Sequence, residues 1–137
     1  MEIVTANKQG RVPVTVFHIK GEISAESSEK LQQQAQDAYE AGTRDLLLDL
    51  SKVTFLSSAG LRAIHYIFML LRTDSSEERA KSVRKGIAEG TYRSPHLKLL
   101  NPKREVLQTL KMSGFDMFLE IHSKMRAAIN SFECAAL

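Results

Sequence analysis

Runs of apolar and β-branched residues predict where the strands of this chain lie. Residues 12–19 are rich in valine, isoleucine and threonine, a composition typical of a strand. Pro13 must lie at a sheet edge or at the strand start, because it cannot donate a ladder hydrogen bond. Residues 46–50 form a nearly unbroken apolar run too short for a helix, which predicts a central strand covered on both faces. Residues 2–6 are a weaker candidate for a first strand, and residues 53–56 form a brief further apolar segment.

Apolar residues at helical spacing predict two helices in the first half of the chain. The first follows Gly21-Glu22-Ile23-Ser24, which interrupts the strand pattern, and Ser24 or Ser27 can cap it. Gly42 is well placed to end this helix. The second follows the turn Ser57-Ser58-Ala59-Gly60. The predicted apolar faces comprise Leu31, Ala35, Ala38 and Tyr39 in the first helix, and Leu61, Ile64, Ile67, Phe68, Leu70 and Leu71 in the second.

The chain changes character between residues 73 and 96, where charged residues dominate. We expect an exposed insertion over 73–96, helical at 76–88. The apolar pattern of a strand resumes at residues 97–100.

The last third of the chain predicts two further helices and one strand. Asn101 and Pro102 are typical of a helix start, with Asn as cap and Pro at the first helical position. Gly114 ends this helix, and residues 117–121 are the predicted last strand. Ser123 is the expected cap of a terminal helix. Its inward side chains are Met125, Ala128, Ile129 and Phe132.

Strands that alternate with helices predict an α/β fold, in which helices cover a sheet. The expected order is strand, strand, helix, strand, helix, insertion, strand, helix, strand, helix. The chain has 137 residues, 43% of them hydrophobic, which is enough for one domain with a substantial core. We therefore expect a single domain over residues 1–137, with its insertion at about 73–96.

Charge and cysteine content narrow the class of protein. The net charge of +3 is small and its basic residues are spread along the chain, so direct nucleic-acid binding is not expected. Cys134 is the single cysteine, which excludes an internal disulfide. The first residues lack the apolar core of a signal peptide. The longest apolar stretch, 61–71, is far shorter than the roughly 20 residues that span a bilayer. We expect a cytoplasmic protein without a membrane partner.

Familiar catalytic and cofactor motifs are missing from the sequence. The histidines His18, His65, His96 and His122 stand far apart, with no spacing typical of a metal site, so we expect no metal and no cofactor. No glycine-rich phosphate-binding motif occurs. The serines of the 57–60 turn lack the GxSxG pattern of a nucleophile elbow, which disfavours hydrolysis. These features predict a binding protein rather than an enzyme.

The turn Ser57-Ser58-Ala59-Gly60 joins a buried strand to an amphipathic helix and has two interpretations. A serine can simply cap the helix while the glycine permits close packing. Alternatively, the turn can carry an anion, because a helix N-terminus offers unpaired N–H groups and positive dipole character. A phosphate there adds about −1.5 to −2 charges to a small exposed patch. Such a charge can repel a partner without unfolding the protein.

Residues 46–62 resemble the STAS family, which includes bacterial anti-sigma factor antagonists. Members carry an apolar strand, then Asp-Leu-Ser, a short apolar segment, and Asp-Ser-Ser-Gly or Ser-Ser-Ala-Gly before a helix. The matching residues here are Asp49-Leu50-Ser51 and Ser57-Ser58-Ala59-Gly60. Gly21-Glu22-Ile23-Ser24 is similar to the family's Gly-Glu-Leu-Asp turn, and Met112-Ser113-Gly114-Phe115 to a later helix stop. The similarity covers most of the chain outside 73–96.

The resemblance implies a mixed sheet with helices packed mainly on one face, and a role in partner switching. The unphosphorylated protein would bind an anti-sigma factor that is also a serine kinase. Phosphorylation would break the complex, and a serine phosphatase would restore it. Aligned on Gly60, the phosphoacceptor is Ser58, with Ser57 as its rival. The partner-binding residues implied are Gly21, Glu22, Ile23, Ser24, Ser57, Ser58, Ala59, Gly60, Leu61 and Arg62.

Two other hypotheses stay open. The chain could be a constitutive interaction or scaffold module of the same fold, or a member that binds a small ligand or lipid, without a phosphoswitch. It could also be a hydrolase that uses a serine of the turn. Whether the chain forms a homodimer is open as well.

Overall fold

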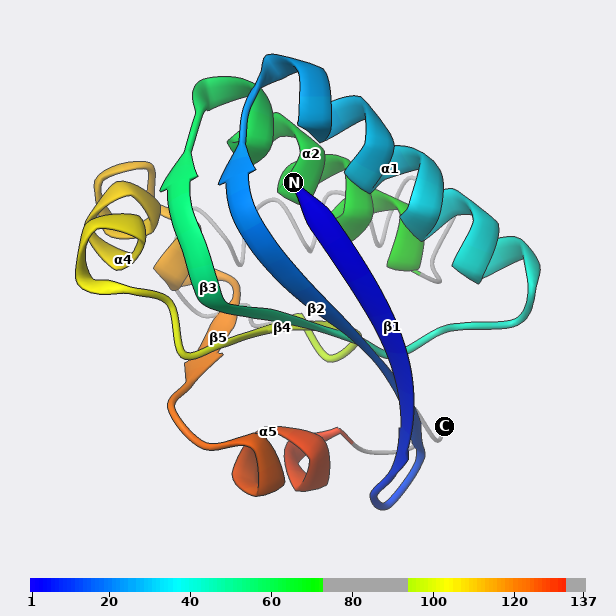
Figure 1. Cartoon of the computed structure of the whole chain (residues 1–137). Helices are drawn as coiled ribbons and strands as arrows, with labels where there is room; N and C mark the ends of the chain where they lie inside the picture. Colours follow the sequence, from blue (N-terminus) through cyan, green and yellow to red (C-terminus); the bar gives the residue numbers. More distant parts are fainter. Residues whose placement is uncertain (73–93, 133–137) are drawn as a thin grey trace, which may run out of the picture.

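The computed structural model describes residues 1–72 and 94–132, and Figure 1 shows the arrangement of their elements. Five strands of the described residues form one sheet in the order β1-β2-β3-β4-β5. β1 and β2 are antiparallel, and the other neighbours are parallel. The strands are β1 (Glu2–Gln9), β2 (Pro13–Ile23), β3 (Leu46–Leu56), β4 (Leu97–Leu100) and β5 (Glu120–His122). This mixed sheet confirms the predicted α/β fold class.

Helices cover the sheet mainly on one face, as predicted. They are α1 (Ala25–Glu40), α2 (Ser58–Leu71), α4 (Arg104–Met112) and α5 (Met125–Ser131), with the short 3-10 helix η1 (Phe115–Met117) after α4. The main core lies under α1, α2 and α4, and α5 covers part of the opposite face (Figure 1). No helix in the described part of the chain is long and apolar enough to cross a membrane.

The predicted central strand is confirmed and is longer than expected. β3 lies in the middle of the sheet and runs without interruption from Leu46 to Leu56. Leu46 and Leu48 belong to the main core, while Leu47 packs in a second cluster with Phe132 beneath α5. Successive strand residues point to opposite faces. The unbroken apolar run therefore serves two cores at once.

The expected break at Gly21-Glu22-Ile23-Ser24 is wrong, because β2 continues to Ile23. The strand accommodates the irregular sequence by register shifts against β3, one of them between Gly21 and Glu22. Gly21 has a φ of 101°, in the left-handed region that glycine adopts without steric cost. Such bulges allow a strand to bend and continue. The first strand is also longer than predicted and ends at Gln9.

The predicted caps of the first helix are confirmed. Ser24 is the N-cap of α1, and its Oγ accepts from the N–H of Ser27 at 3.3 Å. The N–H of Ser24 donates in return to Ser27 Oγ at 2.7 Å, so both candidate serines take part in one capping box. Gly42 follows the helix with a φ of 115°, and Thr43 N–H bonds the carbonyl of Ala38 at 2.9 Å.

Two predicted caps in the last third are wrong. α4 begins at Arg104 after the N-cap Lys103, because the N–H of Asn101 donates to the carbonyl of His122 at 2.6 Å and thereby extends the sheet. The N-cap of α5 is Lys124 rather than Ser123. The predicted last strand, 117–121, is also displaced to β5, because the residues before it form η1.

The predicted insertion at 73–96 lies mostly outside the described residues, and its expected helix at 76–88 lies there entirely. Its last residues are not exposed as predicted, since Ser94 and His96 are buried. Ser94 N–H donates to the carbonyl of Phe118 at 2.8 Å. His96 Nδ1 lies 3.0 Å from Asp45 Oδ1. These contacts attach the end of the segment to the residues just before β3 and just after η1.

Candidate functional site

The carboxyl ends of β2 and β3 lie side by side and bring the two predicted motifs together. Ile23 is the register partner of Leu56, the last residue of β3. α1 begins directly after β2, and α2 begins directly after β3. The N-termini of both helices therefore lie at the carboxyl end of these two strands (Figure 1). The residues 21–24 and 57–62 therefore lie next to one another at this end of the sheet.

Ser57 is the N-cap of α2, and its hydroxyl is fully engaged. Its Oγ accepts from the N–H of Gly60 at 3.0 Å and donates to the carbonyl oxygen of Ile23 at 2.7 Å. The N–H of Ser57 donates to the same Ile23 carbonyl at 3.0 Å. Ser57 thus fixes the start of α2 to the end of the neighbouring strand.

Ser58 is the first residue of α2, and its side chain is exposed. Its Oγ has no hydrogen-bond partner within residues 1–72 and 94–132. Arg62 lies one helical turn further along and is also exposed. The first turn of α2 carries no acidic residue. The N-terminus of α2 therefore presents a free hydroxyl at its positive end.

Gly60 allows α2 to pack closely on the strands. A Cβ at this position would lie 2.6 Å from Leu56 Cδ1, 2.9 Å from Ile23 Cγ2 and 3.0 Å from the Ile23 carbonyl oxygen. Real Cβ atoms essentially never show contacts under 3.0 Å. Glycine is therefore required here for space, and the close approach holds the turn against β2.

Phe55 is a surface residue of this region that the sequence pattern missed. Its side chain is 53% exposed, and it is the register partner of Glu22, which is exposed as well. Phe55 precedes the N-terminus of α2 by three residues, so it adds exposed apolar surface close to the turn. The sequence indicates Phe55 only as part of a short apolar segment, so periodicity gave no sign that it faces solvent.

A shallow apolar hollow of about 550 Å³ lies along α2. Tyr66 and Met69 are 37% and 42% exposed, and the Tyr66 hydroxyl donates to Gln36 Oε1 of α1 at 2.6 Å. The lining residues are Leu61, Arg62, His65, Tyr66, Met69 and Phe115. Phe115 comes from η1, which no local pattern in the sequence connects with α2. The hollow follows from tertiary structure alone.

A hydrogen-bonded cluster of Ser51, Asp49 and His18 lies elsewhere on β2 and β3. His18 Nδ1 is 2.7 Å from Asp49 Oδ2, and Ser51 donates to Asp49 Oδ1 from both Oγ (2.7 Å) and its N–H (3.1 Å). Burial by itself would raise the pKa of Asp49, but the hydrogen bonds from Ser51 and His18 outweigh it, and the pKa is lowered.

This cluster does not have the order of a hydrolase triad. In a triad the imidazole lies between the nucleophile and the carboxylate. Here the carboxylate of Asp49 lies in the middle and Ser51 donates its proton to it. Neither Ser57 nor Ser58 has a histidine among its hydrogen-bond partners in the described residues. The arrangement therefore gives the hydrolase hypothesis no geometric support.

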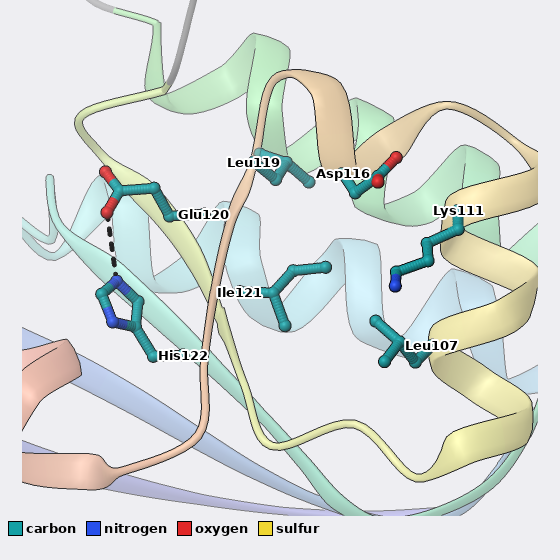
Figure 2. A pocket seen from close by; sticks show the side chains of 7 residues that line it. All are labelled: Leu107, Lys111, Asp116, Leu119, Glu120, Ile121 and His122. Carbon is teal, nitrogen blue, oxygen red and sulfur yellow. Dashed lines mark hydrogen bonds and ion pairs between the residues drawn. The ribbon is translucent and has the colours of Figure 1, made fainter.

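Elsewhere in the described residues, charged side chains form small hydrogen-bonded groups, such as that of Lys98, Glu120 and His122, rather than a metal centre. No group of three histidine, cysteine or acidic side chains in the described residues could hold a metal ion. A hollow of about 430 Å³ lies between α4, η1 and β5. In Figure 2, Ile121 and Lys111 point into this hollow, while Glu120 and His122 point to the other side of β5. His122 Nε2 lies 3.2 Å from Glu120 Oε1. None of its lining residues belongs to the Ser57 turn.

Solved structures of similar fold include anti-sigma factor antagonists. One, described as a putative anti-sigma factor antagonist from Thermotoga maritima, has a TM-score of 0.67 and 18% identity, over 87% of this chain and 86% of that one. Another, from Mycobacterium paratuberculosis, has a TM-score of 0.68 and 18% identity, over 96% and 94%. The phosphorylated Bacillus cell fate determinant SpoIIAA has a TM-score of 0.61 and 14% identity, over 94% and 97%. No curated protein matches the chain at a significant level.

The fold and the site together define a small α/β domain whose central strand ends in a serine-capped helix. The family model of the STAS domain matches residues 4–77, more than half of the chain. The chain therefore belongs to the STAS domain family. The matched segment contains both motifs of the candidate site and all of α2.

Proposed function

We propose that this chain is a cytoplasmic anti-sigma factor antagonist, which binds an anti-sigma factor with serine kinase activity and is released from it by phosphorylation of Ser58. The single observation that carries the proposal is that the two serines of the turn differ in exposure and hydrogen bonding. The hydroxyl of Ser58 is exposed and unpaired among the described residues, while that of Ser57 is held by Ile23 and Gly60. Membership of the STAS family and the likeness to structures described as anti-sigma factor antagonists support the role.

Ser58 is the better phosphoacceptor on structural grounds. Phosphorylation of Ser57 would remove the proton that its Oγ donates to the Ile23 carbonyl, and would bring an anion toward that oxygen. A hydrogen bond of this kind contributes about 0.5–1.5 kcal/mol to stability. Ser58 makes no such bond in the described structure, so its modification removes none. A kinase can also reach an exposed side chain without local unfolding.

The fold is suited to carry a phosphate at Ser58. An anion at a helix N-terminus is stabilised by about 0.3–1 kcal/mol. Arg62 lies four residues along the same helix, at the spacing that allows an ion pair with the modified side chain. A partner that covers Phe55 and Leu61 would instead have to remove water from a group carrying about −1.5 to −2 charges. Phosphorylation thus weakens the complex and spares the fold.

The phosphoacceptor can be tested with purified protein, its cognate kinase and ATP. We expect one phosphate per chain by intact mass, with loss of incorporation in Ser58→Ala. Ser57→Asn is the matched control, since asparagine also caps helices but cannot be phosphorylated. It should be modified as the wild type is. Absence of phosphate at both serines refutes the switch, and modification of Ser57 alone refutes the choice of Ser58.

Binding to the anti-sigma factor tests the consequence of the charge. Ser58→Asp should raise the dissociation constant at least about tenfold, equivalent to about 1.4 kcal/mol, while Ser58→Ala should leave it unchanged. Treatment of the phosphorylated protein with a serine phosphatase should restore binding. Equal affinity of the Ser58→Asp and Ser58→Ala variants would contradict the proposal.

The apolar hollow beside α2 favours a second function, a constitutive interaction module. Tyr66 and Met69 expose apolar surface that does not depend on the state of Ser58. Met69→Lys should then abolish capture of the native partner, and Ser58→Asp should leave capture intact. Loss of capture in Ser58→Asp supports the phosphoswitch instead.

A further inference from the structure

The outer edge of β1 is a long strand edge that the described structure leaves open. Among the described residues, β1 pairs with β2 on one side and has no strand on the other (Figure 1). Edge strands of this kind present unpaired N–H and C=O groups that can pair with another chain. The side chains of Glu2, Val4 and Lys8 on this strand are exposed. Val4 is 57% exposed and adds an apolar side chain to this edge.

The hydrogen bonds of the β1–β2 hairpin fix which residues face this edge. Pro13 has no N–H, and Gly10 N–H donates to the carbonyl of Val12 at 3.2 Å. Thr15 N–H donates to the carbonyl of Asp45 at 3.0 Å and so points away from β1. The pair Asn7↔Thr15 is therefore a non-hydrogen-bonded pair, and the adjacent pair, Lys8↔Val14, is hydrogen-bonded.

Alternate residues of β1 consequently point their backbone groups away from β2. They are Ile3, Thr5 and Asn7. Their N–H and C=O groups have no hydrogen-bond partner among residues 1–72 and 94–132. Gln34 of α1 donates to the Thr5 hydroxyl at 3.0 Å, which engages the side chain and leaves the backbone groups open.

We propose that a second copy of this chain pairs with β1 in antiparallel orientation, about a two-fold axis at Thr5. In this register Ile3 and Asn7 exchange hydrogen bonds between the copies, and Thr5 pairs with Thr5 of the second copy. Glu2 then stands opposite Lys8 of the second copy, twice by symmetry. The sheets of the two copies become one continuous sheet, through an isologous interface.

Charge and side-chain complementarity select this register. The pairs Glu2–Lys8 and Val4–Ala6 occupy non-hydrogen-bonded positions across the interface, where side chains approach most closely. A two-fold axis at Val4 would place Glu2 opposite Ala6, and an axis at Ala6 would place Lys8 opposite Val4. Neither shifted register matches a charge with its opposite. Lysine on an edge strand discourages pairing with most partners, but Glu2 of a second copy neutralises it.

Oligomeric state and one proline substitution test the proposal. The full chain should dimerise in analytical ultracentrifugation over a range of concentrations. Thr5→Pro removes an outward N–H without touching the β1–β2 ladder, so the circular dichroism spectrum should be unchanged. The dissociation constant of the dimer should rise at least about tenfold. A wild-type chain that is monomeric at every concentration overturns the proposal. The same holds if the edge of β1 binds only extended peptides of other proteins.

Cysteine cross-linking tests the register in a Cys134→Ser background. Thr5→Cys should form a disulfide-linked dimer on oxidation, because hydrogen-bonded antiparallel pairs have Cα atoms about 5.5 Å apart, within disulfide reach. Asn7→Cys is the matched control and should not cross-link, since its counterpart lies about four residues away, roughly 13 Å along the strand. Cross-linking at Asn7, or at neither site, contradicts this register.

Charge exchange provides an independent check. Lys8→Glu should raise the dissociation constant of the dimer by about tenfold, because it creates two like-charge pairs. Combining it with Glu2→Lys should restore the wild-type value. Failure of the double variant to recover sinks the proposed pairing. Thr5→Pro should leave phosphorylation of Ser58 unaffected, so this surface and the phosphoswitch can fail separately.

Discussion

The close approach of α2 to the strands predicts that Gly60→Ala destabilises the protein. Gly60 lies within α2, and its backbone is not among the positive-φ glycines. Helix propensity alone therefore favours alanine by about 1 kcal/mol. Packing predicts the opposite sign, because the added methyl would meet Leu56 and the backbone of Ile23. The two effects compete, and their magnitudes decide the outcome.

Packing should dominate. Overpacking a well-packed site costs about 1–3 kcal/mol. The Ile23 carbonyl oxygen, 3.0 Å from where the added methyl would lie, also accepts the two hydrogen bonds from Ser57. Displacing it weakens bonds that contribute about 0.5–1.5 kcal/mol each. After subtraction of the propensity gain, the free energy of unfolding should fall by about 2 kcal/mol.

Urea unfolding followed by circular dichroism measures this change. With a denaturant dependence of about 1–3 kcal/mol per molar urea, the midpoint should fall by roughly 1 M. Leu56→Val removes the nearest atom, so its effect should be non-additive with Gly60→Ala by at least about 0.5 kcal/mol. The matched control is Gly42→Ala, which meets no atom within 4 Å and should add independently to Leu56→Val. A neutral or stabilising Gly60→Ala would refute the packing argument.

Two further predictions concern hydroxyl groups. Ser57→Ala should lower the free energy of unfolding by about 1–2 kcal/mol, because it removes the helix cap and the bond to Ile23, and a loss within experimental error in urea unfolding would contradict this. Asp49 should titrate below its ordinary value of 3.8, and Ser51→Ala should raise its pKa, as measured by NMR. Since the folded pKa is depressed, Asp49 stabilises the protein above pH 3.8 and this contribution is lost as pH falls through the folded value. Acidification should therefore destabilise Ser51→Ala less than the wild type.

Local sequence rules predicted elements whose determinants are themselves local. The apolar run at 46–50 identified the central strand, and Ser24 and Gly42 marked the ends of α1. The rules failed where a distant partner decided the conformation. Asn101 and Pro102 have the composition of a helix start, yet Asn101 bonds the carbonyl of His122 in β5 and the helix begins later.

The candidate site shows the same division. Gly60 and the serine cap were predicted from their order after an apolar strand. The choice between Ser57 and Ser58 could not be made from spacing, because it depends on Ile23, which is 34 residues away from Ser57 in sequence. Phe115 joins the hollow on α2 for a tertiary reason too. Local chemistry thus located the turn, and tertiary contacts determine which hydroxyl is accessible.

The opposite environments of the adjacent serines Ser57 and Ser58 suit the proposed surface switch. Phosphorylation of the switch residue must change the stability of the fold little and must weaken the complex strongly. Ser57 fails the first condition, because its hydroxyl joins α2 to β2 through Ile23. Ser58 meets it, because it lies at the positive end of α2 with its side chain in solvent. The second condition depends on what covers the surface, and a partner that packs on Phe55 would have to bury the phosphate next to an apolar contact. Ser57 therefore fixes the start of α2, and this keeps Ser58 at the exposed helix N-terminus that the proposed phosphate would occupy.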